Sequence, residues 1–268
     1  MFRKFHPQFW LLFIGMLIST VGASMIWPFL MIYISERLDQ PLATAASLLT
    51  LNAAAGIVFS FISGQLLDQF GRKWLMVISL AGLGIYYLLI GQATQLQHFA
   101  ILLVLAGALQ PLYRVGADAM LADLIPEAQR PEAYSLMRMS NNLGVSVGPA
   151  VGGFIAASSY NIAFFIAAGG MLTYSLLMLV MGRETLAASS DGTRRALPLR
   201  EYLAILKDRE YVYYLVAFTL TQVGAAIIWV LLGVHAKTNF GIPESRYGFI
   251  PATNAIMVVA LQYGVTRQ

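Results

Sequence analysis

The chain has 268 residues, of which 58% are hydrophobic and only 11% charged, with a net charge of +4 and no cysteine. A soluble domain carries about 25% charged residues, so this composition excludes a water-soluble globule and predicts an all-α polytopic membrane protein. The absence of cysteine excludes disulfides and thiolate metal sites, and three scattered histidines do not form a metal-ligand pattern, so we expect no cofactor.

Long apolar runs separated by short polar loops predict eight membrane-spanning helices. The first run is longer than the apolar core of a signal peptide, which is about 7–15 residues, so we expect it to be a retained helix. The predicted spans cover residues 9–34, 42–67, 74–92, 99–124, 131–157, 162–182, 211–236 and 247–266.

Between the sixth and seventh spans, residues 183–210 are charged and interrupt the pattern. Apolar side chains recur there at helical spacing beside basic ones, which is typical of an amphipathic helix lying on a membrane surface, while a solvated linker is the alternative. We therefore expect an N-terminal six-helix bundle over residues 1–182, a cytoplasmic linker over 183–210 and a partial C-terminal bundle of two helices over 211–268. The apolar positions of the linker helix are Leu199, Tyr202, Leu203 and Leu206.

The basic residues predict the orientation of the chain. In the predicted topology most of the lysines and arginines in loops fall on the side of the N-terminus, and only Arg37, Lys237 and Arg246 fall on the other side. Because basic loops remain in the cytoplasm, we expect a cytoplasmic N-terminus and a multi-pass protein of the plasma membrane, which is the inner membrane in a bacterium. This distribution also indicates that the net positive charge reflects membrane topology and not binding to nucleic acid.

The loop between the second and third spans carries the most specific pattern in the chain. Residues 64–73 read Gly-Gln-Leu-Leu-Asp-Gln-Phe-Gly-Arg-Lys, where the glycines permit a tight turn and Asp68 lies four residues before Arg72, close enough to pair on one helix face. The loop resembles the signature Gly-x-Leu-x-Asp-Arg-x-Gly-Arg-Lys of major facilitator superfamily transporters. Gln69 departs from it, since the family usually has arginine there.

This resemblance implies the major facilitator fold, here a six-helix N-terminal bundle plus the first two helices of the C-terminal bundle. Twelve helices are expected in the family and eight are predicted here, so we interpret the sequence as a fragment, with a naturally short protein as the alternative. The resemblance also implies a conformational gate in which charges relay between this loop and the end of the fourth span. A plain interfacial salt bridge is the alternative, and the residues concerned are Gly64, Asp68, Gly71, Arg72, Lys73 and Asp123.

The fifth span contains a stripe of small residues. Gly144, Gly148 and Gly152 recur every four residues and form a smooth face on which another helix can approach closely. Together with Pro149 and Gly153, the stripe resembles the antiporter motif of the drug:proton branch, Gly-x-x-x-Gly-Pro-x-x-Gly-Gly. The alternative is an ordinary helix-packing device.

Three charged residues are predicted well inside the membrane. Ionisable groups are costly there, so Arg114 and Asp118 in the fourth span and Arg138 in the fifth are candidates for proton or substrate coupling. A buried ion network joining the two helices is the alternative. Since the centre of the first span holds no acidic residue, Asp118 is our candidate for the proton site.

Polar and aromatic side chains at mid-depth are candidates for the wall of a substrate cavity, although such groups also bond neighbouring helices. These residues are Ser24, Trp27, Asn52, Tyr113, Asn142, Gln222, Trp229 and Asn254.

The resemblance implies a secondary transporter that exports amphipathic, drug-like compounds in exchange for protons by alternating access, with the proton gradient as its energy source. The alternatives are a proton-coupled symporter or metabolite exporter of the same superfamily, and a transport-inactive fragment. We expect no enzymatic activity, because no His-Glu-x-x-His pair, Gly-x-Ser-x-Gly elbow or metal-ligand cluster occurs. The expected partners are a small-molecule substrate and the lipid bilayer, with no nucleic acid and a monomeric full-length protein.

Overall fold

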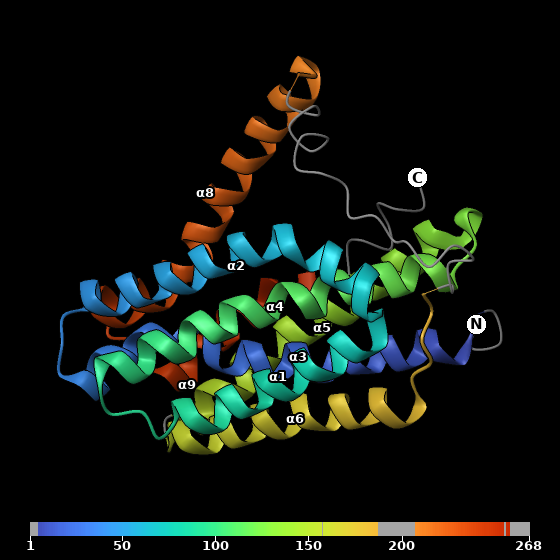
Figure 1. Cartoon of the computed structure of the whole chain (residues 1–268). Helices are drawn as coiled ribbons and strands as arrows, with labels where there is room; N and C mark the ends of the chain where they lie inside the picture. Colours follow the sequence, from blue (N-terminus) through green and yellow to red (C-terminus); the bar gives the residue numbers. More distant parts are fainter. Residues whose placement is uncertain (1–4, 157, 187–206, 255, 258–268) are drawn as a thin grey trace.

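A computed structural model describes residues 5–156, 158–186, 207–254 and 256–257, and these residues form helices and connecting turns (Figure 1). A single 3-10 turn, η1 (Glu127–Gln129), precedes the fifth helix. The α-helices are α1 (Pro7–Leu38), α2 (Leu42–Phe70), α3 (Arg72–Ile90), α4 (Leu96–Leu124), α5 (Arg130–Ala156), α6 (Tyr160–Met181), α8 (Arg209–Phe240) and the short α9 (Glu244–Tyr247). Residues 249–254 are helical again.

Each of the first seven predicted spans coincides with a long helix, which confirms the all-α polytopic fold class. Among the described residues, six helices are long and apolar enough to cross a membrane: α1, α2, α3, α4, α6 and α8. At about 1.5 Å per residue the 27 residues of α5 are also long enough, but its polar and glycine residues lower its hydropathy. The predicted linker helix lies outside the described residues, as does the last span beyond residue 257, and the three-part division of the chain stays a prediction.

The first six helices pack as one bundle. The closest pairings join α1 to α5, α2 to α4 and α3 to α6, and further contacts of α1 with α6 and of α3 with α4 connect these pairs. A continuous apolar core fills the space between them. Within it, the ring of Tyr33 on α1 packs against Phe99 of α4 and Phe164 of α6, with ring centroids 6.2 and 4.9 Å away.

The start of α1, the α2–α3 turn and the ends of α4 and α6 lie together at one end of the bundle, which we call the N-terminal end. Gly71 is the single residue between α2 and α3 and has a φ of 92°, a conformation that favours glycine because it has no Cβ. This sharp reversal places the last turn of α2 beside the first turn of α3. It therefore fixes the position of the signature loop.

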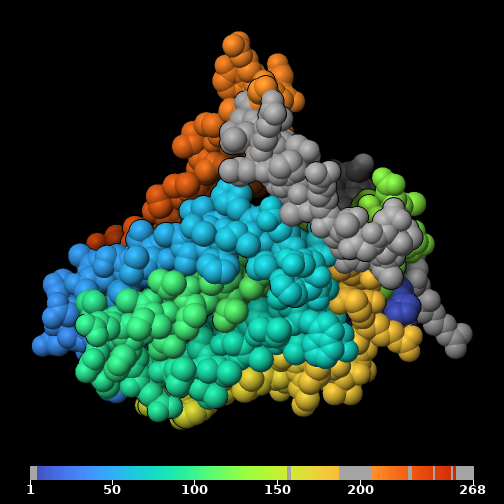
Figure 2. Space-filling view, in the orientation of Figure 1, coloured from blue at the N-terminus to red at the C-terminus, as the bar shows by residue number. Residues whose placement is uncertain are grey.

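The helix α8 meets the bundle at the other end, which we call the opposite end. Figure 1 shows α8 leaning away from α2, and in Figure 2 its tip stands above the surface that α2 forms. The last turns of α8 contact α1: Gly233 lies against the carbonyl of Pro28, and Lys237 Nζ lies 2.7 Å from Glu36 Oε1. Earlier in α8, nearly all described side chains are exposed.

Candidate functional site

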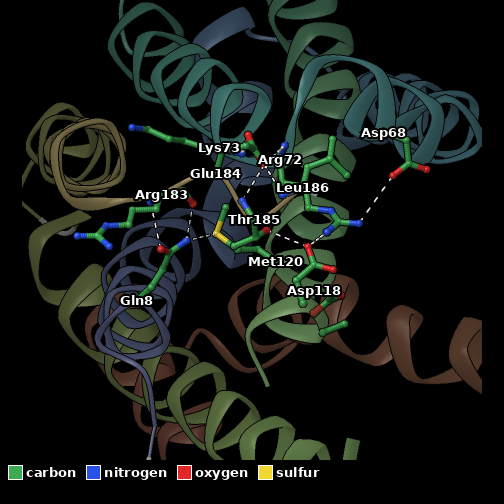
Figure 3. A network of polar contacts seen from close by, with 12 residues as sticks. Gln8, Asp68, Arg72, Lys73, Asp118, Met120, Arg183, Glu184, Thr185 and Leu186 are labelled. Carbon is green, nitrogen blue, oxygen red and sulfur yellow. Dashed lines mark hydrogen bonds and ion pairs between the residues drawn. The ribbon is translucent and has the colours of Figure 1, made fainter. Parts of the chain in front are cut away.

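The N-terminal end carries a charge cluster of Asp68, Arg72 and Asp123, of which Figure 3 labels Asp68 and Arg72. Arg72 begins α3 and forms an ion pair with Asp123 near the end of α4, and its Nη2 lies 3.8 Å from Asp68 Oδ1 near the end of α2. The side chains of Arg72 and Asp123 are 15% and 29% exposed, whereas that of Asp68 is 63% exposed. Since solvent weakens exposed ion pairs, Asp123 is the stronger partner of Arg72.

The other residues of the signature loop are placed around this cluster. The backbone N–H of Gly71 donates to the carbonyl of Leu67, 3.1 Å away, and closes the end of α2. The ammonium of Lys73 lies 5.4 Å from the ring centroid of Trp74, within cation–π range. Open space surrounds Gly64, so the structure gives no steric reason for glycine at that position.

A short segment after α6 crosses the N-terminal end, and we call residues 183–186 the strap. Its Glu184 carboxylate accepts hydrogen bonds from the backbone N–H groups of Arg72 and Lys73, each at 3.1 Å. The first N–H groups of a helix have no partner within the helix, and Gly71 has no side chain to supply one. The strap therefore caps α3 with a negative charge, which the helix dipole also favours.

The strap also contacts the partner of Arg72. Thr185 Oγ1 donates a hydrogen bond of 2.9 Å to Asp123 Oδ2. On the other side Gln8, only 4% exposed, donates through Nε2 to the carbonyl of Arg183 at 2.7 Å and accepts from its backbone N–H at 3.1 Å. Hydrogen bonds thus join the strap to α1, α3 and α4, as Figure 3 shows.

The sequence analysis missed Gln8, Glu184 and Thr185. A usable signal was present, because in an alternating topology every even-numbered span returns to the same side of the membrane. The residues after the sixth span must therefore lie at the same end as the signature loop and the end of the fourth span. Glu184 is the first acidic residue after α6, and its charge complements a loop that carries Arg72 and Lys73.

Three charged side chains lie farther along the helices, away from the N-terminal end. Arg114 and Asp118 on α4 and Arg138 on α5 are all exposed. In the part of the chain that the structure describes, no carboxylate lies within 4.0 Å of the guanidinium of Arg114 or of Arg138. The alternative of a buried ion network between α4 and α5 therefore does not match the described geometry.

The glycine stripe of α5 faces α1. A Cβ at Gly144 would meet Thr20, one at Gly148 would meet Ser24, and one at Gly152 would meet the backbone of Met25. The Oγ of Ser24 donates a hydrogen bond of 3.0 Å to the carbonyl of Gly144. The stripe therefore allows the backbones of α1 and α5 to approach closely.

A second face of α5 contacts the segment after α8. Gly248 lies against the backbone of Pro149 and Ala150, and the rings of Phe154 and Phe249 meet edge to face with centroids 5.9 Å apart. Ser146 Oγ donates to the carbonyl of Ala252 at 3.4 Å. The antiporter-like motif, with the buried Gly153 at its end, therefore lies between α1 and residues 247–252.

The predicted cavity residues divide into two groups. Trp27, Gln222 and Asn254 are exposed and Asn142 is half-buried, so each has open space on at least one side; the side chain of Trp229 lies outside the described part. For the other group the prediction is corrected by the structure. The buried side chain of Asn52 donates to the carbonyl of Leu103 at 2.8 Å, and the buried hydroxyl of Tyr113 lies 3.1 Å from Ser19 Oγ, so both join neighbouring helices.

Six long helices packed as one bundle, with a further long helix whose described contacts with the bundle lie at the opposite end, define a polytopic membrane protein. The model of the Major Facilitator Superfamily matches residues 12–267, nearly the whole chain. The chain therefore belongs to this superfamily of transporters, which confirms the resemblance of the signature loop and the expectation that the protein is not an enzyme.

Individual relatives share this assignment. The chain is 26% identical over 91% of its length to a Na(+), Li(+), K(+)/H(+) antiporter of Planococcus maritimus, and 27% identical over 94% to the multidrug resistance protein MdtG of Escherichia coli O9:H4. It spans 64% of the length of each. The solved structure of the nucleoside transporter NupG (D323A mutant) superposes with a TM-score of 0.73 at 11% identity, covering 97% of this chain and 68% of that one.

Proposed function

We propose that the protein is a secondary active transporter that exports amphipathic, drug-like compounds in exchange for protons. The observation that carries this proposal is the asymmetric attachment of α8 and residues 247–252, which contact α1 and α5 at the opposite end only. Alternating access requires two helix sets that rock about a shared contact while a central site opens to one side. The attachment at the opposite end provides such a contact.

The distribution of basic residues supports a cytoplasmic position for the N-terminal end. In that orientation, the exposed first turns of α8 lie on the cytoplasmic side, and the contacts of the antiporter-like motif lie on the outer side. An exporter loads its substrate in this arrangement. The charge cluster and the strap then lie at the cytoplasmic mouth, where they hold α3 and α4 in a fixed relation during rocking.

Similarity to a cation/H(+) antiporter supports exchange for protons, and similarity to a multidrug resistance protein supports drug export. We assign the proton site to Asp118, which lies in a membrane-spanning helix one turn from Arg114. The energy source is the proton gradient, and the full-length protein acts as a monomer in the plasma membrane. Because the chain spans 64% of these relatives, the activity of the whole protein belongs to this proposal.

The test uses everted membrane vesicles from cells that express the chain. A fluorescent amphiphile is followed while a proton gradient is imposed and then collapsed with a protonophore. We expect uptake into the vesicles that needs the gradient and that Asp118→Asn abolishes, whereas Asp208→Asn, outside the spans, leaves it unchanged. Transport that is independent of the gradient contradicts exchange for protons. The absence of any transport contradicts the proposal and supports an inactive fragment.

A further inference from the structure

The charges inside the described membrane-spanning helices do not balance. Apart from groups at or near helix ends, these helices hold Arg114, Arg138 and Asp118. The described interior positions therefore carry two guanidinium groups, which stay charged in proteins, and one carboxylate. Even with Asp118 ionised, the described interior keeps one positive charge in excess.

The two arginines lie at similar depth. Arg114 is ten residues before the end of α4 and Arg138 eight residues after the start of α5, which places them about 15 and 12 Å from the N-terminal end at a rise of ~1.5 Å per residue. A hydrocarbon core is about 30 Å thick, so both side chains begin near the level where transporters of this architecture bind substrate. The two helices approach each other on the N-terminal side of both arginines, where Tyr134 Oη on α5 donates to the carbonyl of Asp118 on α4 at 3.5 Å.

Both arginines point away from the bundle core. On α5, Arg138 shares a face with Asn142 and Pro149. Because Pro149 lies against Gly248, this face of α5 is directed toward residues 247–252. On α4, the side chain of Arg114 is exposed together with that of Asp118 one turn later. In a membrane, exposed guanidinium groups are found facing water-filled cavities or anionic partners rather than lipid.

From this geometry we infer that Arg114 and Arg138 form a receptor for the anionic group of the substrate, and that the preferred substrates are amphipathic anions bearing a carboxylate or sulfonate. Guanidinium groups bind such oxyanions through two parallel N–H···O bonds, and neither arginine is paired with a described carboxylate. The inference rests on the proposed function, because it treats the bound anion as the compound that is transported. The charge preference itself is a property of binding, and it does not depend on coupling to protons.

The experiment measures binding to the chain in nanodiscs of zwitterionic lipid, with no gradient present. The probes are 11-(dansylamino)undecanoate and its uncharged primary amide, which share one fluorophore and one alkyl chain. The readout is the ratio of their affinities for the wild type, for Arg114→Gln, for Arg138→Gln and for the control Arg209→Gln. The control removes the same charge from an exposed position at the start of α8.

We expect the carboxylate to bind roughly tenfold more tightly than the amide, because a hydrogen-bonded charge pair is lost in the amide. In Arg114→Gln and Arg138→Gln this ratio falls toward one while the affinity for the amide is retained, which also shows that the variants are folded. In Arg209→Gln the ratio is unchanged. Equal affinities in the wild type, or a ratio that neither interior substitution alters, overturns the inference.

This result is separate from that of the vesicle assay. If the chain prefers the carboxylate but transports nothing, the anion receptor is supported and the proposed function is contradicted. If the chain transports amphiphiles with a proton gradient but shows no charge preference, the proposed function is supported and the anion receptor is contradicted.

Discussion

At the N-terminal end of the bundle, ion pairs and charge-assisted hydrogen bonds connect α3, α4 and the strap, all within the first 186 residues. At the opposite end, glycine contacts and aromatic rings connect α1 and α5 to residues 233–252. The first set of contacts joins helices of one bundle. The second set joins that bundle to the helices that follow it.

The difference matters for motion. Glycine contacts bring backbones together over an area without long side chains, so the helices can rotate against one another while they stay in contact. Ion pairs at a water-exposed end contribute little net stability each, but several of them fix the relative position of the helices that they join. We infer that the first six helices move as one unit, and that the contact at the opposite end is the pivot.

The largest expected effect comes from filling the contact between α1 and α5. A Cβ at Gly152 would overlap backbone atoms of Met25, which cannot turn aside as a side chain can. We expect Gly152→Ala to lower the free energy of unfolding by roughly 1–3 kcal/mol, the cost of overpacking. Thermal unfolding in detergent, followed by a thiol-independent dye or by circular dichroism, measures it.

Gly169→Ala is the matched control, because no atom lies within 4 Å of a Cβ at Gly169 on α6. There the substitution should be neutral or slightly stabilising, since alanine loses less backbone entropy in a helix. Equal destabilisation by both substitutions would show that helix propensity, rather than the close approach of α1, determines the outcome.

The next effect separates the two carboxylates of the charge cluster. Asp123→Asn removes the less exposed partner of Arg72 and weakens the bond from Thr185, and we expect a cost of about 0.5–1.5 kcal/mol. Asp68→Asn acts on a 63% exposed carboxylate at 3.8 Å and should cost about 0–1 kcal/mol. Denaturant unfolding and transport rates measured side by side test this order. A larger effect at Asp68 on both measurements contradicts the assignment of Asp123 as the stronger partner.

Much of the fold follows from the pattern of apolar runs, because a bilayer requires helices of a defined length. The boundaries shift by a few residues where polar side chains continue a helix into the interface, as in α2, which runs on through Asp68 to Phe70. The signature loop was recognisable from its resemblance to the family motif, and the positive φ at Gly71 gives a physical reason for the glycine there. The resemblance also implied a link between Arg72 and Asp123, and these two residues form an ion pair.

Rotation of a helix about its own axis was not predictable in the same way. Lipid and protein interior are similarly apolar, so hydropathy does not distinguish the face of Asn52 that meets α4 from a face that lines a cavity. For Glu184 the alternating topology indicated the end of the bundle but not the capping role. That role depends on a tertiary contact between residues more than a hundred positions apart, which no local pattern encodes.

A smaller effect tests the strap. Glu184→Gln keeps an acceptor near the first N–H groups of α3 but removes the charge that the helix dipole favours, so we expect a cost of about 0.5–1 kcal/mol. Hydrogen exchange at the backbone amides of Arg72 and Lys73 should become faster. Glu210→Gln in the first turn of α8 is the control and should leave these amides unchanged. Unchanged exchange in Glu184→Gln contradicts the cap.

The smallest effect concerns the ion pair that joins α1 and α8 in the described residues. Lys237 and Glu36 approach to 2.7 Å, but their side chains are 36% and 54% exposed, so their coupling should be about 0–1 kcal/mol and should weaken with salt. Because each side chain also has its own surroundings, single substitutions mix several effects. A double-mutant cycle with Lys237→Gln and Glu36→Gln isolates the pair. A coupling above about 2 kcal/mol would mean that this end, like the N-terminal end, is held by charge, and the pivot would then have to be sought elsewhere.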